Sequence, residues 1–318
     1  MTCRCSAPMI SRVDPARCRF GEARSFTMYP DFLVVGAQKA GTTWLHRNLL
    51  EHPEVWMPEH EVHYFDRKIR DESFDDAWYA SLFEPAEAGK TVGEVTPAYS
   101  VIDRETVGRA HALMPEAKIV FLMRNPVERA WSHAVMRIVK KEGGVENVPV
   151  ETIIKRFDRE KSQLRTNYLR TLENWGAYYP PERVFVGFLE DIHFHAEGFL
   201  TRLCEFLGVD ASFRPPKMNK RINARSTDEM PIEVASHLAR VYGDSIRSLD
   251  ERFGGYASFW RFCAERLAED SRAESLITYP LWDSPLREEW TAARRENADM
   301  FGEDVPQSGP LSAIQVPR

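Results

Sequence analysis

The chain has 318 residues, and 43% of them are hydrophobic, which is enough for one large α/β domain or two modest ones. Its net charge of −6 argues against a general nucleic-acid binder. No segment approaches the roughly 20 apolar residues of a membrane span, and the N-terminus lacks the apolar core of a signal peptide. We therefore expect a cytoplasmic protein with no transmembrane anchor and no nucleic-acid partner.

The first predicted strand, residues 32–35, runs directly into the glycine-containing segment 36–43, which reads GAQKAGTT. A helix is predicted over 43–51. Gly36 and Gly41 allow a close backbone approach that a Cβ would block. The N–H groups of the loop and of the helix start then face an anion. The layout favours a phosphate-binding loop over a bare glycine turn.

The lysine of this loop is displaced from the triphosphate-binding pattern G-x-x-x-x-G-K-[ST]. Thr42 stands at the seventh position, and Lys39 lies three residues earlier. A γ-phosphate would lack its usual clamp, so the loop suits a donor with one phosphate and one transferable anionic group. The residues predicted to bind this donor are Gln38, Lys39, Ala40, Gly41, Thr42, Thr43 and Trp44.

Further apolar runs predict strands at 91–95, 118–123 and 183–189. Helical periodicity or capping predicts helices at 103–114, from 126 onward, at 160–178, 195–207 and 231–252. Strands that alternate with helices predict an α/β fold with a doubly wound parallel sheet. We expect a disordered leader at 1–30, a single domain at 31–265 and a C-terminal extension at 266–318. The extension packs on its own domain, contacts another subunit or covers the substrate, and its aromatic residues do not decide between these.

A second anion site is predicted where the strand 118–123 ends in Arg124. The carboxyl ends of parallel strands are where such sheets bind ligands, and Ser132 lies on the following helix. An arginine fork binds phosphate well. The alternative is an arginine paired with a carboxylate and a serine that caps its own helix.

The two segments together resemble those of sulfotransferases that use 3′-phosphoadenosine 5′-phosphosulfate (PAPS). The segment 36–43 resembles the family's 5′-phosphosulfate loop, and 118–132, which reads KIVFLMRNPVERAWS, resembles its 3′-phosphate segment. The similarity extends loosely over 31–260. It is greatest to the branch of the heparan sulfate N- and 3-O-sulfotransferases and their bacterial relatives, and it implies a P-loop-like fold with PAPS as co-substrate.

The resemblance also implies the catalytic groups. The segment 61–66, EVHYFD, resembles the stretch with the catalytic glutamate, so Glu61 is the candidate base and a surface carboxylate is the alternative. His63 points the same way from an extended segment and can share or orient the proton. Lys39 would stabilise charge on the departing phosphate oxygen. Arg221 would belong to a basic loop that closes over the nucleotide, with a solvated basic turn as the alternative. The transfer needs no metal.

One departure concerns the acceptor. The segment 94–99, EVTPAY, resembles a motif of the 3-O-sulfotransferases that has lysine after its glutamate, but here Val95 follows Glu94. The resemblance therefore implies sulfuryl transfer to a hydroxyl or amine of a saccharide, glycolipid or small molecule, without choosing a heparan-type acceptor. A homodimer stays open.

The alternative function is a P-loop kinase or NTPase. Its support is the strand 184–189, which ends in Glu190 and Asp191 and mimics a metal-holding segment. We interpret these acids as caps of the next helix.

Overall fold

The computed structural model describes residues 28–216, 218, 227–269, 275–294 and 307–314. Residues 1–27 of the predicted leader, and Arg221, lie outside them. A six-stranded sheet has the order β2-β3-β1-β4-β5-β8. Its strands are β1 (Phe32–Gly36), β2 (Val55–Trp56), β3 (Thr91–Val95), β4 (Lys118–Met123), β5 (Val184–Phe188) and β8 (Gly309–Pro310). Strands β1 to β5 pair in parallel, and β8 is antiparallel to β5. The predicted doubly wound parallel sheet is confirmed, with an antiparallel edge strand in addition.

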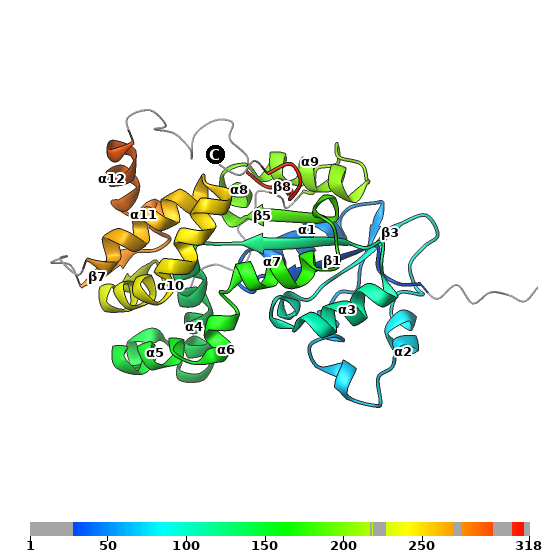
Figure 1. Ribbon diagram of the computed structural model, residues 1–318, viewed down its shortest axis with the longest axis horizontal. Helices are drawn as coiled ribbons and strands as arrows, with labels where there is room; N and C mark the ends of the chain where they lie inside the picture. Colours follow the sequence, from blue (N-terminus) through cyan, green and yellow to red (C-terminus); the bar gives the residue numbers. More distant parts are fainter. Residues whose placement is uncertain (1–27, 217, 219–226, 270–274, 295–306, 315–318) are drawn as a thin grey trace, which may run out of the picture.

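Helices cover both faces of the sheet (Figure 1). Helices α1, α8 and α9 lie over one face, and α3 and α7 lie over the other. The helices are α1 (Thr42–Leu50), α2 (Asp76–Ser81), α3 (Arg104–Leu113), α4 (Pro126–Glu142), α5 (Val150–Phe157), α6 (Glu160–Leu164), α7 (Tyr168–Gly176), α8 (Leu189–Phe194), α9 (Ala196–Leu207), α10 (Ile232–Phe253), α11 (Tyr256–Ala268) and α12 (Leu286–Ala293). No helix of the described residues is long and apolar enough to cross a membrane.

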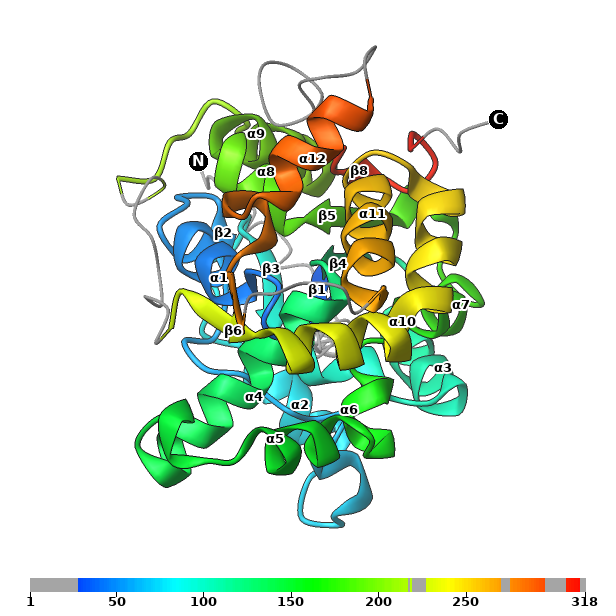
Figure 2. The same cartoon turned by 90° about the vertical axis from the view of Figure 1, so that its left-hand side faces the viewer.

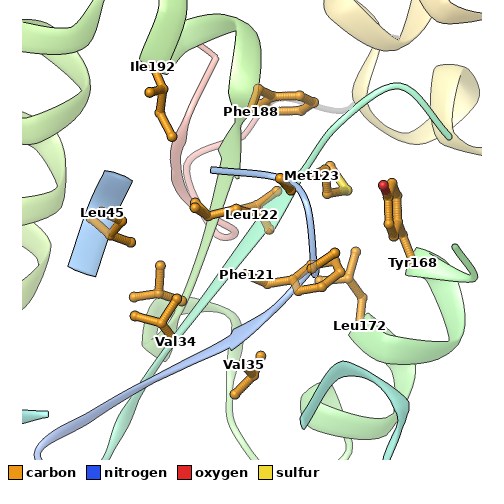
Figure 3. Packing of buried hydrophobic residues seen from close by; sticks show 14 of the residues in the cluster. Val34, Val35, Leu45, Phe121, Leu122, Met123, Tyr168, Leu172, Phe188 and Ile192 are labelled. Carbon is orange, nitrogen blue, oxygen red and sulfur yellow. The ribbon is translucent and has the colours of Figure 1, made fainter. Parts of the chain in front are cut away.

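The strands are continuously apolar because both of their faces are buried. Every residue of β1 and of β5 is buried. Figure 3 shows the alternation along β4: Phe121 lies on the side of Tyr168 and Leu172 in α7, whereas Leu122 lies on the side of Leu45 and Ile192. Strand β1 lies between β3 and β4, so the end of β1 and the end of β4 are neighbours. The predicted loop and Arg124 therefore meet at the switch point of the sheet.

The C-terminal helices gather at one end of the sheet. Helices α10, α11 and α12 lie beyond the end to which the β4 and β5 arrows point (Figures 1 and 2). A separate two-stranded sheet pairs β6 (Glu229–Pro231) antiparallel with β7 (Leu276–Thr278). Four side chains of the predicted extension are buried against the rest of the protein: Tyr279, Leu281, Trp282 and Trp290. This part of the extension therefore packs on its own domain; the division at residue 265 stays a prediction.

One predicted helix is wrong in length. The segment 160–178 forms α6 and α7 rather than one helix. Asn167 stands at the break, and its side-chain oxygen accepts a hydrogen bond from the Arg170 N–H as the N-cap of α7. Asparagine competes for backbone groups in this way and so favours a helix start over a helix interior. Five helices of the described residues were not predicted: α2, α5, α8, α11 and α12.

Candidate active site

The loop between β1 and α1 has the backbone of an anion site. Gly41 is the N-cap of α1 in the left-handed conformation, with φ of 97°, and no side chain caps this helix. A Cβ on Gly36 would lie 2.7 Å from the Cβ of Ser100. The Ala37 N–H donates to the Leu122 carbonyl at 2.7 Å, which ties the loop to β4. The first turn of α1 therefore presents N–H groups that no side chain satisfies, as an anion site requires.

Lys39 lies half-buried in this loop, where burial and, secondly, the charge of Arg124 lower the pKa of its ammonium group. Its carbonyl accepts a hydrogen bond from Arg124 Nη1 at 3.3 Å. The other predicted loop residues divide into half-buried Gln38 and Gly41, buried Ala40, Thr42 and Trp44, and exposed Thr43. The Trp44 indole N–H donates a hydrogen bond to the Met218 carbonyl at 2.9 Å, so this side chain also ties the start of α1 to Met218.

Arg124 is buried and already paired. Its Nε and Nη2 donate to Glu128 Oε2 at 3.1 and 2.9 Å, and Nη2 also donates to the Tyr279 hydroxyl at 2.6 Å. Burial alone would lower the pKa of Arg124, but Tyr279 and Glu128 outweigh it and the pKa is raised. The pairing with a carboxylate, which the sequence left open as an alternative, is the one observed. Of the bonds that the described residues show, only the one to the Lys39 carbonyl reaches the loop.

A cluster of positive charge lies between the loop and α4. Half-buried Ser132 and His133 are adjacent on this helix. The pKa of His133 is lowered to about 3 by burial and then by four cations. We call these four the cationic cluster: Arg129, Arg165, Arg137 and Lys39. Neutral His133 beside four cations indicates a region built to receive negative charge.

Arg129 is the most deeply buried member of this cluster. Its Nε donates to Thr166 Oγ1 at 2.9 Å, while its Nη1 and Nη2 have no hydrogen-bond partner among the described residues. Burial lowers the pKa of the guanidinium, with Tyr168 and Tyr242 opposing the shift. Its charge therefore acts on the loop and α4 through a poorly solvated interior.

A chain of three side chains, which we call the acid chain, follows β2. His63 Nε2 lies 3.0 Å from Glu61 Oε2, and His63 Nδ1 lies 3.0 Å from Asp66 Oδ1. The exposed fraction falls from 48% for Glu61 to 17% for His63 and 11% for Asp66. The predicted Glu61–His63 contact is present, although the backbone of His63 is left-handed, with φ of 59°, rather than extended. An exposed carboxylate thus lies 3.0 Å from a histidine that is in turn hydrogen-bonded to a more deeply placed carboxylate.

The acid chain is held by the residues after β3. Thr96 Oγ1 accepts the Val62 N–H at 3.2 Å, and the Tyr99 hydroxyl accepts the Tyr64 N–H at 3.0 Å. Beneath them, burial raises the pKa of Glu94 to about 8, and the nearby Tyr99 and Tyr79 hydroxyls oppose this shift. This floor fixes the segment that carries Glu61.

A direct contact and electrostatic interactions connect the segment of the acid chain with α1. His46 Nε2 in α1 lies 2.9 Å from the carbonyl oxygen of Pro58, three residues before Glu61. The charge of Glu61 raises the pKa of His46 in α1, although burial is the larger cause and the net pKa is lowered. Asp66 likewise acts on Arg165 of the cationic cluster, whose pKa is lowered mainly by burial. A proton acceptor and an electropositive site therefore adjoin.

The acids after β5 lie inside α8 and cap neither this helix nor α9, so that interpretation was wrong. Glu190 Oε1 accepts the Trp260 indole N–H at 2.6 Å. Asp191 accepts the Tyr256 hydroxyl at 2.9 Å and the Ser308 N–H at 2.7 Å. These acids hold the C-terminal region to β5. Among the described residues, no group of three or more His, Cys, Asp or Glu is arranged to hold a metal ion.

A family model described as a sulfotransferase domain matches residues 29–237, more than half of the chain. The chain belongs to the sulfotransferase family. The human heparan sulfate glucosamine 3-O-sulfotransferase 6 (Homo sapiens) is 32% identical over 184 residues, which cover 57% of this chain and 53% of that protein. The human 3-O-sulfotransferase 3B1 is 28% identical over 190 residues, covering 57% and 46%. The chain thus spans about half the length of the curated relatives it matches.

A crystal structure of a sulfotransferase from Alicyclobacillus acidocaldarius shows the same fold. It superposes with a TM-score of 0.56 at 23% identity, covering 70% of this chain and 95% of that chain. The phosphate loop, the acid chain and Arg124 all lie inside the matched sulfotransferase domain. Tyr279, which contacts Arg124, lies outside it.

Proposed function

We propose that this sulfotransferase moves the sulfuryl group of PAPS to a hydroxyl or amine of a saccharide, glycolipid or small molecule. The observation that carries the proposal is the acid chain Glu61–His63–Asp66 beside an electropositive phosphate loop. A proton acceptor and an anion site are the two things that sulfuryl transfer to a protonated nucleophile requires.

Three features of the site support PAPS as the donor. The uncapped start of α1 offers N–H groups to the 5′-phosphosulfate. Lys39 offers an ammonium group for the developing charge on the phosphate oxygen. Arg124 and the α4 members of the cationic cluster, Arg129 and Arg137, offer positive charge to a second phosphate, and Ser132 offers a hydroxyl. The role assigned to Arg221 stays a prediction.

In the proposed reaction the acceptor oxygen or nitrogen attacks sulfur in line with the bond to the phosphate oxygen. A new bond to sulfur forms as the sulfur–oxygen bond to the phosphate breaks, and adenosine 3′,5′-bisphosphate leaves. Glu61 takes the proton of the acceptor, because it is the exposed end of the acid chain. His63 orients this carboxylate and spreads the charge toward Asp66. A placed base contributes about 10²–10⁴-fold in rate.

For the acceptor, a saccharide is the first class to test. The relatives' names state heparan sulfate glucosamine as what those proteins sulfate. Val95 stands where that branch has a second lysine, so a heparan-type acceptor is one candidate among saccharides, glycolipids and small molecules. The cytoplasmic location and the homodimer stay predictions.

Isothermal calorimetry tests the donor, and transfer from labelled PAPS to acceptor pools tests the activity. We expect adenosine 3′,5′-bisphosphate to bind about tenfold or more tighter than ATP, since each charge-assisted bond to the second phosphate adds roughly 1.5–3 kcal/mol. This preference should persist in EDTA. Binding of Mg·ATP as tight as that of the bisphosphate would contradict the proposal and favour the kinase alternative.

A further inference from the structure

The C-terminal segment contributes directly to the surroundings of Arg124. A guanidinium has five N–H donors, and four hydrogen bonds from Arg124 are formed within the described residues. Two go to Glu128, one to the Tyr279 hydroxyl and one to the Lys39 carbonyl. The donor that remains is on Nη1, the same nitrogen that contacts the phosphate loop. The nitrogen with an unused N–H is therefore the one that lies against the phosphate loop.

Tyr279 is held firmly in this position. Its ring is buried and lies 5.2 Å from the guanidinium carbon of Arg124. Its backbone N–H donates to the Asp228 carbonyl at 2.8 Å, which continues the pairing of β7 with β6. Two residues on, the Leu281 N–H donates to Glu128 Oε1 at 2.7 Å. The hydroxyl is thus placed from both sides by backbone bonds, and one of these bonds also holds the carboxylate partner of Arg124.

These contacts distinguish an anchored segment from a movable cover. A cover that opened over the nucleotide would have to break the backbone bond to Asp228, break the bond to Glu128 and expose the ring, all together. Each buried group left unpaired would cost about 1–3 kcal/mol. The contacts therefore suit a permanent part of the site.

We propose that residues 276–281 complete the nucleotide site, with Tyr279 as the positioning residue that aims Arg124 at the second phosphate of the donor. This inference rests on the proposed function. The Tyr279 hydroxyl accepts one Nη2–H and, together with the two bonds to Glu128, restrains the planar guanidinium from turning about its Nε bond, so that Nη1 stays against the loop. Preorganisation of this kind raises affinity because the ligand does not bear the ordering cost.

The test is the variant Tyr279→Phe, which keeps the ring and removes the hydroxyl. Calorimetry on the full chain would compare adenosine 3′,5′-bisphosphate with AMP, which lacks the second phosphate. We expect the affinity for the bisphosphate to fall about tenfold, the lower range for a hydrogen bond to a charged group, and the affinity for AMP to stay unchanged. Tyr178→Phe, on an exposed tyrosine that follows α7, is the matched control and should change neither.

A double-mutant cycle sharpens the test. In an Arg124→Lys background the planar fork is absent, so Tyr279→Phe should cause no further loss of the preference for the bisphosphate. Additive effects would contradict the inference, as would equal loss of both nucleotides, which a merely structural tyrosine would give. Tighter bisphosphate binding in Tyr279→Phe would show that the hydroxyl competes with the phosphate. If the wild type itself fails to prefer the bisphosphate, the proposed function falls first.

Discussion

The acid chain and the Arg124–Glu128 pair are both charge clusters at the carboxyl edge of the sheet, but they differ in exposure. In the acid chain the outermost group, Glu61, is 48% exposed while its partners lie progressively deeper. In the arginine pair both side chains are buried, at 8% and 1% exposure. A group that must exchange a proton with a bound molecule has to reach the surface. A group that orients a ligand gains from being held on all sides.

The difference in exposure also predicts different effects of mutation on the stability of the fold. Removal of an exposed terminal carboxylate leaves no buried charge behind, so it should affect chemistry and spare the fold. Removal of a buried carboxylate leaves an uncompensated guanidinium, which is strongly destabilising.

The largest expected effect is on turnover in Glu61→Gln. We expect kcat to fall about 10²–10⁴-fold, because the amide cannot accept the proton of the acceptor. The dissociation constant for adenosine 3′,5′-bisphosphate should stay unchanged, since Glu61 is not part of the loop. Turnover with labelled PAPS and calorimetry measure the two quantities. Glu59→Gln, a neighbouring exposed glutamate, is the control and should keep full activity. A parallel loss of turnover and nucleotide affinity in Glu61→Gln would mean that Glu61 is structural.

The arginine pair should show the reverse pattern. In Glu128→Gln, urea unfolding should reveal a loss of about 3–5 kcal/mol in the free energy of unfolding, because a buried guanidinium loses its carboxylate. Glu265→Gln is a matched control. It breaks another Arg–Glu pair four residues apart, with Arg261 Nε at 2.8 Å, but both side chains are about half exposed. Exposed pairs contribute about 0–1 kcal/mol. Equal losses in the two variants would remove the energetic distinction drawn above.

Local patterns predicted the parts of this site that are local in sequence. The strands β1, β3 and β4 follow from apolar runs, and the loop follows from its two glycines and displaced lysine. Glu61 and His63 were paired correctly because their spacing is short. Asp66 was missed because His63 adopts a left-handed backbone, with φ of 59°, which turns the chain and returns the third residue to the imidazole. An extended segment would have directed it elsewhere.

Contacts between distant segments carried no signal in the sequence. Tyr279 lies 155 residues from Arg124, and no periodicity links them. Glu128 was within reach of prediction, since an acid four residues after an arginine in a helix start often pairs with it. The cationic cluster was also missed, because Arg165 comes to α4 from the break between α6 and α7, where one continuous helix had been predicted.

The smallest expected effect, when it is taken per pH unit, is a pH dependence of the free energy of unfolding that the two regions share. Each contains one buried carboxyl with a raised pKa. Beneath the acid chain, burial is the main cause that raises the pKa of Glu94 to about 8. Near the arginine pair, burial and, secondly, the charge of Glu128 raise the pKa of Glu190 to about 8. The ordinary value is 4.5. Between pH 4.5 and about 8 the folded state therefore binds more protons than the unfolded state, so the free energy of unfolding falls as pH rises.

Thermal and urea unfolding between pH 5 and 8 would measure this dependence. We expect each carboxyl to contribute a slope of roughly −1 kcal/mol per pH unit. Glu94→Gln and Glu190→Gln mimic the protonated forms, so each should remove one contribution and leave the other. Glu72→Gln, an exposed control, should leave the slope as it is in the wild type. If the slope survives in the double variant, these carboxyls are ionised in the folded protein, and the floor under the acid chain then carries a buried charge rather than a proton.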